Sequence, residues 1–280
     1  MLRRLNAGLL PMCLALALVA APCALAWGPN AERLVTNKAV DTLPPEIGTF
    51  FDSNRRYLVQ HVTDSDVSAN TSTADKENGI IALDHYGTFP FSNLPRTYAA
   101  AAGKYGKHTL DKYGLLPWQI GVYSQKLTQA LESQDWQGAK IAAAALAYYV
   151  AAAHDPFNTT LNGDGSLSNQ PGVNLRFGGG LVDRYQLFFF VKPNEAIYIK
   201  DPTDHAFEMV LSAHAWLENI LNADRLAHQG LGSYSDEYYD RFYAQAGAIL
   251  VRQLSDASTD VGSYWMTAWI NAGRPQLPRK

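Results

Sequence analysis

The stretch that decides the fold covers residues 147–158 and reads Ala-Tyr-Tyr-Val-Ala-Ala-Ala-His-Asp-Pro-Phe-Asn. It closes a long alanine-rich segment, and alanine has the highest intrinsic helix propensity. Pro156 ends the helical pattern, because proline has no backbone N–H and disfavours helical backbone in the residue before it. We therefore expect a helix over residues 136–154, with His154 and Asp155 at its end.

Helical periodicity recurs in other stretches rich in Ala, Leu, Gln and Glu. These predicted helices cover residues 116–133, 206–222, 235–254 and 258–272, and Asp201 and Pro202 form a start for the second of them. Glycine and proline punctuate residues 159–180, which predicts a long loop, and residues 70–78 predict a polar surface loop. Residues 187–191 and 196–199 fit either a hairpin or a helix end. The fold class predicted from these patterns is mainly α.

The N-terminus has the pattern of a secretory signal peptide. Arg3 and Arg4 precede an apolar run that closes on Ala24-Leu25-Ala26. Cleavage after Ala26 leaves residues 27–280 as a single helical domain, long enough to bury about three-quarters of its unfolded surface. Both cysteines lie in the removed segment, so we expect a secreted or periplasmic protein without disulfides.

The charge pattern argues against a nucleic acid as the partner of this chain. Loss of the signal segment, with its two arginines, changes the formal net charge from −3 to −5. No basic run with interleaved aromatic residues follows, and tight binding to a nucleic-acid backbone requires clustered Lys and Arg. A small polar ligand, such as a nucleotide or a lipid head group, stays open. We expect no transmembrane anchor once the signal is cleaved.

Short motifs in a fixed order extend the pattern of residues 147–158 over the whole mature chain. They are Trp27-Gly28, residues 37–44 (Asn-Lys-Ala-Val-Asp-Thr-Leu-Pro), 84–87 (Asp-His-Tyr-Gly), 94–96 (Leu-Pro-Arg), 115–118 (Leu-Leu-Pro-Trp), Asp164-Gly165, Arg176-Phe177 and 268–275 (Ala-Trp-Ile-Asn-Ala-Gly-Arg-Pro). Together they resemble the secreted zinc-dependent phospholipase C and single-strand nuclease family. The resemblance implies a multi-helix phospholipase C/nuclease-like fold and suggests a bacterial source. In that family three clustered zinc ions bind a phosphodiester and generate hydroxide.

The resemblance assigns nine positions to zinc ligands, and most of them have lost their donor. Trp27 and Asp66 match, with Asp64 as an alternative register, and Glu32 still offers an oxygen. The other six positions hold Gly79, Tyr148, Ala152, Asn158, Asn174 and Gly178. Glycine, alanine and asparagine side chains carry no imidazole or carboxylate for zinc, and tyrosine is a rare ligand. If the family motif is aligned several residues later, His85 takes the place of Gly79. It could then bind a metal together with Asp64 or Asp66, which restores two ligands at most.

The resemblance therefore implies a pseudoenzyme without zinc or another cofactor. We call its former ligand positions, together with His154, the remnant cleft. Two alternatives stay open. The first is a weak phosphodiester hydrolase that uses a residual metal near Trp27, Glu32 and Asp66, and the second is a secreted interaction protein.

Other histidines and aromatic residues have simpler interpretations. His154 is expected to be hydrogen-bonded or to face the helix end, and His205 and His214 to be structural or solvated. The aromatic pairs between Tyr238 and Trp269 and the run Phe188-Phe189-Phe190 predict core residues. An exposed part of that run would instead contact lipid or a partner.

Overall fold

Helix α9 (Trp136–Ala153) lies at the centre of the molecule. The computed structural model describes residues 27–64 and 78–278. Every residue of α9 from Leu146 to Ala153 is buried. A helix that is apolar on all sides is one that neighbours surround, and its small alanine side chains allow those neighbours to approach closely. The helix predicted over residues 136–154 is confirmed to within one residue.

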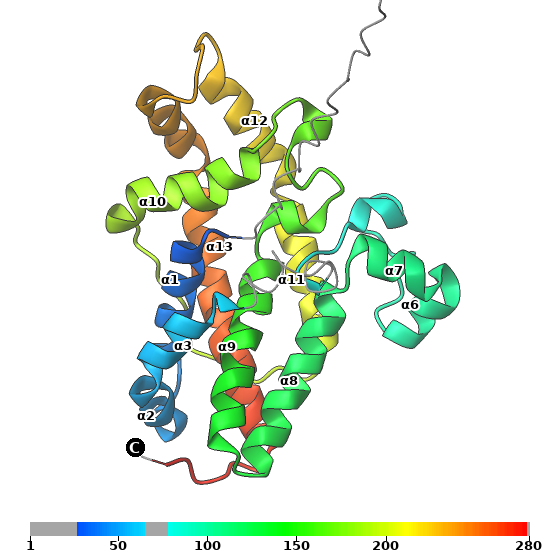
Figure 1. Cartoon of the computed structure of the whole chain (residues 1–280), viewed down its shortest axis with the longest axis vertical. Coiled ribbons are helices and arrows are strands. Elements are labelled where there is room, and N and C mark those ends of the chain that lie inside the picture. The colour runs from blue at the N-terminus through cyan, green and yellow to red at the C-terminus, as the bar shows by residue number, and fades with distance from the viewer. Residues whose placement is uncertain (1–26, 65–77, 279–280) are drawn as a thin grey trace, which may run out of the picture.

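Two long helices flank α9 over much of its length. Figure 1 shows α8 (Leu116–Glu132), α9 and α13 (Asp236–Asn271) side by side, and all three pack on one another. The indole Nε1 of Trp265 donates a hydrogen bond of 3.0 Å to the Ala143 carbonyl, which ties α13 to α9. The ring of Phe51 stacks on Trp265 at 4.7 Å. This buried contact extends the core to the N-terminal helices.

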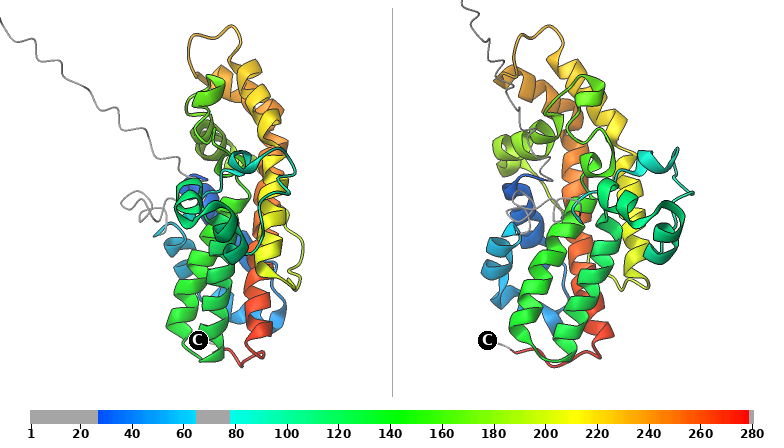
Figure 2. Two further views of the ribbon diagram at one scale, coloured as in Figure 1. Left: turned by 90° about the vertical axis from the view of Figure 1, so that its right-hand side faces the viewer. Right: turned by 45° about the vertical axis from the view of Figure 1, so that its right-hand side comes forward.

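The remaining helices cover the outside of this group. Helices α1 (Pro29–Val40), α2 (Pro45–Ser53) and α3 (Arg55–His61) lie on one side, whereas α6 (Tyr98–Tyr105) and α7 (Lys107–Tyr113) project from the other (Figure 2). Helix α11 (Pro202–His214) packs on α8, and α12 (Leu217–His228) packs on α13. The short elements are η1 (Leu83–Tyr86), η2 (Pro156–Thr159), η3 (Ser166–Ser168), the π-helical η4 (Leu175–Gly180), α10 (Leu181–Tyr185) and η5 (Gln186–Phe188).

The described residues include no strand, so the mainly α fold class is confirmed. Within the same ranges, no helix combines the length and the apolar character that crossing a bilayer would require. The predicted surface loop 70–78 lies outside the described residues, except for Asn78.

Two predicted helix boundaries are wrong. The helix predicted over residues 206–222 is two helices, α11 and α12, because the chain turns at Ala215 and Trp216 to pack first on α8 and then on α13. Conversely, the break predicted between residues 254 and 258 does not exist, and α13 is continuous. The hydroxyls of Ser255 and Ser258 donate to carbonyls four residues earlier, at 2.8 and 2.7 Å, so these polar residues fit inside the helix.

The long loop predicted over residues 159–180 is wrong where η3 and η4 form, at Ser166–Ser168 and Leu175–Gly180. Gly165 and Gly172 do serve turns, with φ of +81° and +78°, whereas Gly180 lies at a close packing contact. A Cβ atom on Gly180 would lie 2.7 Å from Tyr239 Cε1, and one on Gly178 would lie 3.5 Å from Trp27 Cα. Three consecutive glycines therefore form part of a helical run that other elements approach closely.

Of the two structures predicted for residues 187–199, the helix end forms at Leu187 and Phe188, the last residues of η5, and the hairpin does not form. After η5 the chain is extended and lies along α13, where four hydroxyl groups spaced four residues apart accept its backbone N–H groups. The acceptors are Ser255, Thr259, Ser263 and Thr267, and the donors in the same order are Lys192, Asn194, Ile197 and Ile199, at 3.2, 3.0, 3.0 and 2.8 Å. We call these four residues the hydroxyl ladder. It provides the hydrogen bonds that a neighbouring strand would otherwise provide.

Removing a hydroxyl from the hydroxyl ladder should destabilise the protein more at its buried end than at its exposed end. Thr267 and Ile199 are buried, whereas Lys192 at the other end is exposed. Thr267→Val keeps the side-chain volume but leaves the Ile199 N–H buried without an acceptor, which costs about 1–3 kcal/mol. Ser255→Ala is the matched control, because water replaces its hydroxyl at the exposed end and the loss stays within about 0.5 kcal/mol. Urea denaturation followed by circular dichroism measures both values, and equal losses would contradict this account.

Candidate functional site

The site begins where the first described residue meets the end of α9. The side chain of Trp27 is fully buried, and its Nε1 donates a 2.6 Å hydrogen bond to the Ala151 carbonyl. Its ring packs against Phe177 of η4, with 6.0 Å between ring centroids. Residues 27, 151 and 177 are far apart in the sequence, so this contact joins the N-terminal, central and η4 regions at one point.

Two of the predicted positions, Ala152 and Asn158, bond to each other there. The amide Nδ2 of Asn158 donates to the Ala152 carbonyl at 3.0 Å. The carbonyl of Asn158 accepts from Ile81 N at 2.8 Å, which places the segment that begins at Gly79 beside the same turn. The Cβ position of Gly178 lies 3.5 Å from Trp27 Cα. The structure thus brings Trp27, Ala152, Asn158 and Gly178 together.

The other predicted positions lie on elements that enclose this point. Glu32 of α1, Tyr148 of α9 and Asn174 at the start of η4 are all buried, with 1%, 3% and 3% of their surface exposed. Among the described residues, Asn174 Oδ1 has no hydrogen-bond partner. Asp66, the remaining matched position, lies outside the described residues.

His154 does not point into this cluster. Its Nε2 lies 2.9 Å from Asp260 Oδ2, and the other oxygen of Asp260 lies 2.9 Å from His205 Nε2. The side chain of Asp260 is 16% exposed. Burial opposes ionisation of this carboxyl, but hydrogen bonds from the two histidines outweigh it and hold its pKa well below the usual range. The hydrogen bond that His205 donates to Asp260 in turn raises the pKa of His205.

Asp155 is a buried ionisable group beside the remnant position Gly178. It is 1% exposed, and one of its oxygens accepts from Phe157 N at 2.9 Å. The other oxygen lies 3.6 Å from the Cβ position of Gly178. Burial raises the pKa of Asp155 to about 7, although the hydrogen bond from Phe157 partly offsets this effect. A carboxyl that titrates near neutral pH has the properties of a general acid or base, but its side chain is enclosed.

Sequence patterns missed two buried acidic residues that organise this region. One is Asp260. The other is Asp224, which accepts hydrogen bonds from Arg176 Nε at 3.0 Å, from Gln170 Nε2 at 2.6 Å and from the Tyr238 hydroxyl. Both acids lie among the apolar residues of an amphipathic helix, and that placement is the signal that would have found them.

The residues present do not fit a zinc cluster. Zinc needs three or four donors of imidazole, thiolate or carboxylate type. In the described ranges, no group of three or more His, Cys, Asp or Glu side chains could hold a metal ion. The amide of Asn158 is already engaged with a backbone carbonyl, and Gly178 and Ala152 carry no donor.

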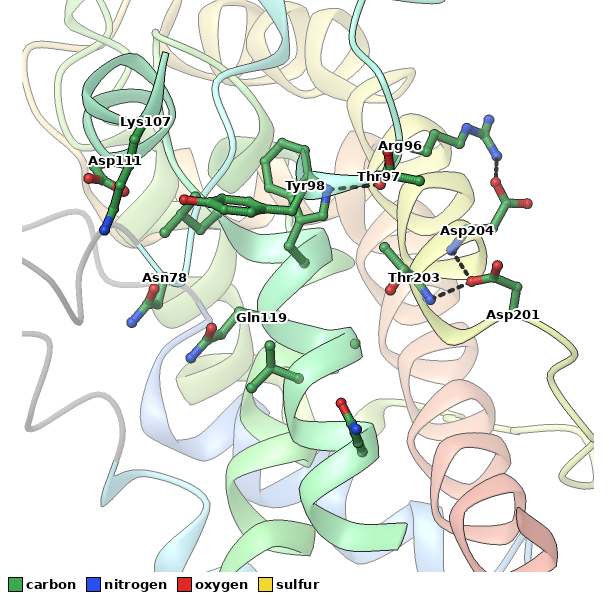
Figure 3. Close-up of a pocket in the computed structure, with 15 residues that line it drawn as sticks. Asn78, Arg96, Thr97, Tyr98, Lys107, Asp111, Gln119, Asp201, Thr203 and Asp204 are labelled. Atoms are coloured by element: carbon green, nitrogen blue, oxygen red, sulfur yellow. Dashed lines mark hydrogen bonds and ion pairs between the residues drawn. The ribbon is translucent and has the colours of Figure 1, made fainter. Parts of the chain in front are cut away.

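An accessible groove of about 920 Å³ opens elsewhere, between α6, α7, α8 and the start of α11. Tyr98 lies in its middle, with Lys107 and Asp111 of α7 at one end and Asp201 and Thr203 at the other (Figure 3). Trp118 packs edge-on against Tyr98, with 5.9 Å between ring centroids. This groove combines an aromatic surface with both signs of charge, and none of the remnant-cleft residues lines it.

The raised pKa of Asp155 predicts how stability depends on pH. The unfolded chain loses this proton near pH 3.8, whereas the folded protein keeps it up to about pH 7. The stability that this carboxyl contributes to the folded protein is therefore fully present below pH 3.8 and falls as pH rises to 7. As pH rises from 3.8 to 7, the unfolding free energy of Asp155→Asn should increase by about 4 kcal/mol relative to that of the native protein. Urea denaturation across this pH range measures the difference.

His205→Gln is the matched control for that experiment. Because the folded pKa of His205 is raised above 6.5, its contribution is present below pH 6.5 and is lost at higher pH. Between pH 3.8 and 7, the difference in unfolding free energy between this variant and the native protein should therefore change only above pH 6.5. A flat difference curve for Asp155→Asn would show that the carboxyl is ionised throughout.

Comparison with known proteins adds no family assignment to this geometry. No protein-family model and no curated protein matches the chain. The resemblance described above therefore depends on its motifs and on the placement of the positions that they specify.

Proposed function

We propose that this chain is a secreted or periplasmic, phospholipase C/nuclease-like protein that has lost its zinc cluster and does not hydrolyse phosphodiesters. One observation carries the proposal. Positions that the resemblance assigns to zinc ligands lie together, yet they are occupied by side chains that pack and bond within the protein. The hydrogen bond from Asn158 to the Ala152 carbonyl is the clearest case, because it joins two such positions directly.

Physical chemistry supports the loss of catalysis in this proposal. Metal-assisted hydrolysis requires ions that clamp the attacking and leaving oxygens and lower the pKa of bound water. Buried amides, an alanine and two glycines supply neither charge nor ligands for such ions. Asp155 retains a raised pKa, but its carboxyl lies among packed residues and cannot reach a substrate in this arrangement.

Elemental analysis of the chain that begins at Trp27 tests the proposal directly. We expect near-zero zinc per chain, also after incubation with excess metal, and no hydrolysis of a chromogenic phosphodiester. Two or three tightly held zinc ions would overturn the proposal. Hydrolysis that disappears in Asp66→Ala and in Glu32→Gln would instead support the residual-metal alternative.

Binding of a small polar ligand in the groove is a second candidate function. The groove offers two cations, three carboxylates and an aromatic surface, whereas the described remnant positions are buried. A zwitterion such as phosphocholine matches this chemistry. Its ammonium group suits Tyr98 and the carboxylates, and its phosphate suits Lys107.

Equilibrium dialysis with phosphocholine separates the groove from the remnant cleft. Tyr98→Leu and Lys107→Gln should each weaken binding, and the paired change Asn158→Leu with Asn174→Leu should leave it unchanged in protein that circular dichroism shows to be folded. The reverse result would place the ligand in the remnant cleft. Absence of binding by the native protein would exclude phosphocholine as its ligand.

A further inference from the structure

Three of the residues after α10 break the rule that large apolar side chains are buried. Leu187, Phe188 and Phe190 are 92%, 77% and 78% exposed. The prediction that this run belongs to the core is therefore wrong for Phe188 and Phe190, although it is confirmed for Tyr238, Phe242, Tyr264 and Trp265. Figure 1 shows the chain turning back at the outer end of α10, at the edge of the molecule.

The surrounding structure enforces this exposure. Phe189 points inward and stacks on Tyr243, with 6.0 Å between ring centroids, and Tyr185 stacks on Tyr243 at 4.4 Å. The backbone at Phe189 is extended, with φ −73° and ψ 130°. Successive side chains of an extended chain point to opposite sides. Anchoring Phe189 against Tyr243 therefore directs Phe190 away from the protein, and Phe188, the last residue of η5, is exposed as well.

Part of the backbone beyond these residues is already hydrogen-bonded within the protein. The N–H groups of Lys192 and Asn194 already donate to Ser255 and Thr259 of the hydroxyl ladder. A protein partner could not extend this segment as a neighbouring strand through those groups. Side chains are what this part of the surface presents.

We propose that Leu187, Phe188 and Phe190 form a lipid-contact tip that inserts into the surface of a bilayer. Each aromatic side chain buries about 150–250 Å² at most. The area that these two phenylalanines and Leu187 can bury is well below the roughly 1,600 Å² of a typical protein interface. A lipid surface needs no complementary shape, and a protruding apolar tip partitions into it in proportion to its area.

Charges near the tip indicate which forces hold it. Arg184 pairs with Asp236 at 2.8 Å, and Asp240 accepts a hydrogen bond from the Tyr185 hydroxyl. Lys192 is exposed two residues beyond the tip. The two cations, Arg184 and Lys192, are therefore balanced by the two carboxylates named above. Attachment is therefore driven by burial of apolar surface, and it depends little on anionic lipid or salt.

Co-sedimentation with phosphatidylcholine vesicles tests the tip. The chain is used from Trp27 onward, because the apolar residues 8–25 would themselves partition into lipid. The native protein should bind vesicles with or without added phosphatidylglycerol, at low and at high salt. The variant Phe188→Ser with Phe190→Ser should bind about a hundredfold more weakly, since each lost aromatic contact is worth about tenfold or more.

Phe89→Ser with Leu167→Ser is the matched control. These side chains are 59% and 72% exposed but lie elsewhere, Phe89 between η1 and α6 and Leu167 in η3, so the control should bind vesicles as the native protein does. Failure of the native protein to bind, or equal binding by the tip variant, would overturn the proposal. Self-association in sedimentation velocity that disappears in the tip variant, without vesicle binding, would identify the tip as an interface between copies. None of the remnant-cleft residues belongs to the tip, so these outcomes are independent of zinc content and hydrolysis.

Discussion

Complete burial of the second half of α9 is the constraint on which the rest of the structure depends. Because alanine leaves little volume between backbones, α8 and α13 pack closely against this helix, and large aromatic side chains reach its carbonyl groups. Both Trp27 and Trp265 donate to backbone oxygens of α9. These hydrogen bonds satisfy buried polar groups on both partners, so they fix where α1 and α13 lie along the helix.

The end of α9 is a polar environment whose groups bond to one another and to neighbouring elements. Asn158 closes the turn by bonding to Ala152, and Asp155 caps the following residues through Phe157. His154 is drawn in another direction, to Asp260 of α13. In this arrangement the polar groups stabilise the turn and join it to its neighbours.

Helix α13 has a second role, because it holds an irregular segment in place. Four hydroxyl groups at four-residue spacing donate into the helix or are buried along it, and they accept the N–H groups of the extended chain. The same segment begins with the exposed apolar residues 187, 188 and 190. A rigid support thus lies directly behind the most exposed hydrophobic surface of the described residues.

The sequence by itself determined the mainly α class, the extents of α8 and α9, the start of α11 at Asp201 and the absence of zinc donors at six of the positions that the resemblance specifies. These features depend on local propensity and on residue chemistry, which a single sequence contains. Only the tertiary structure decided that His154 pairs with Asp260, that Gly180 lies against Tyr239, and that Phe188 and Phe190 face outward. Contacts between residues distant in the chain, such as Asp260 with His154 and Phe189 with Tyr243, determine these features, and no local pattern encodes them.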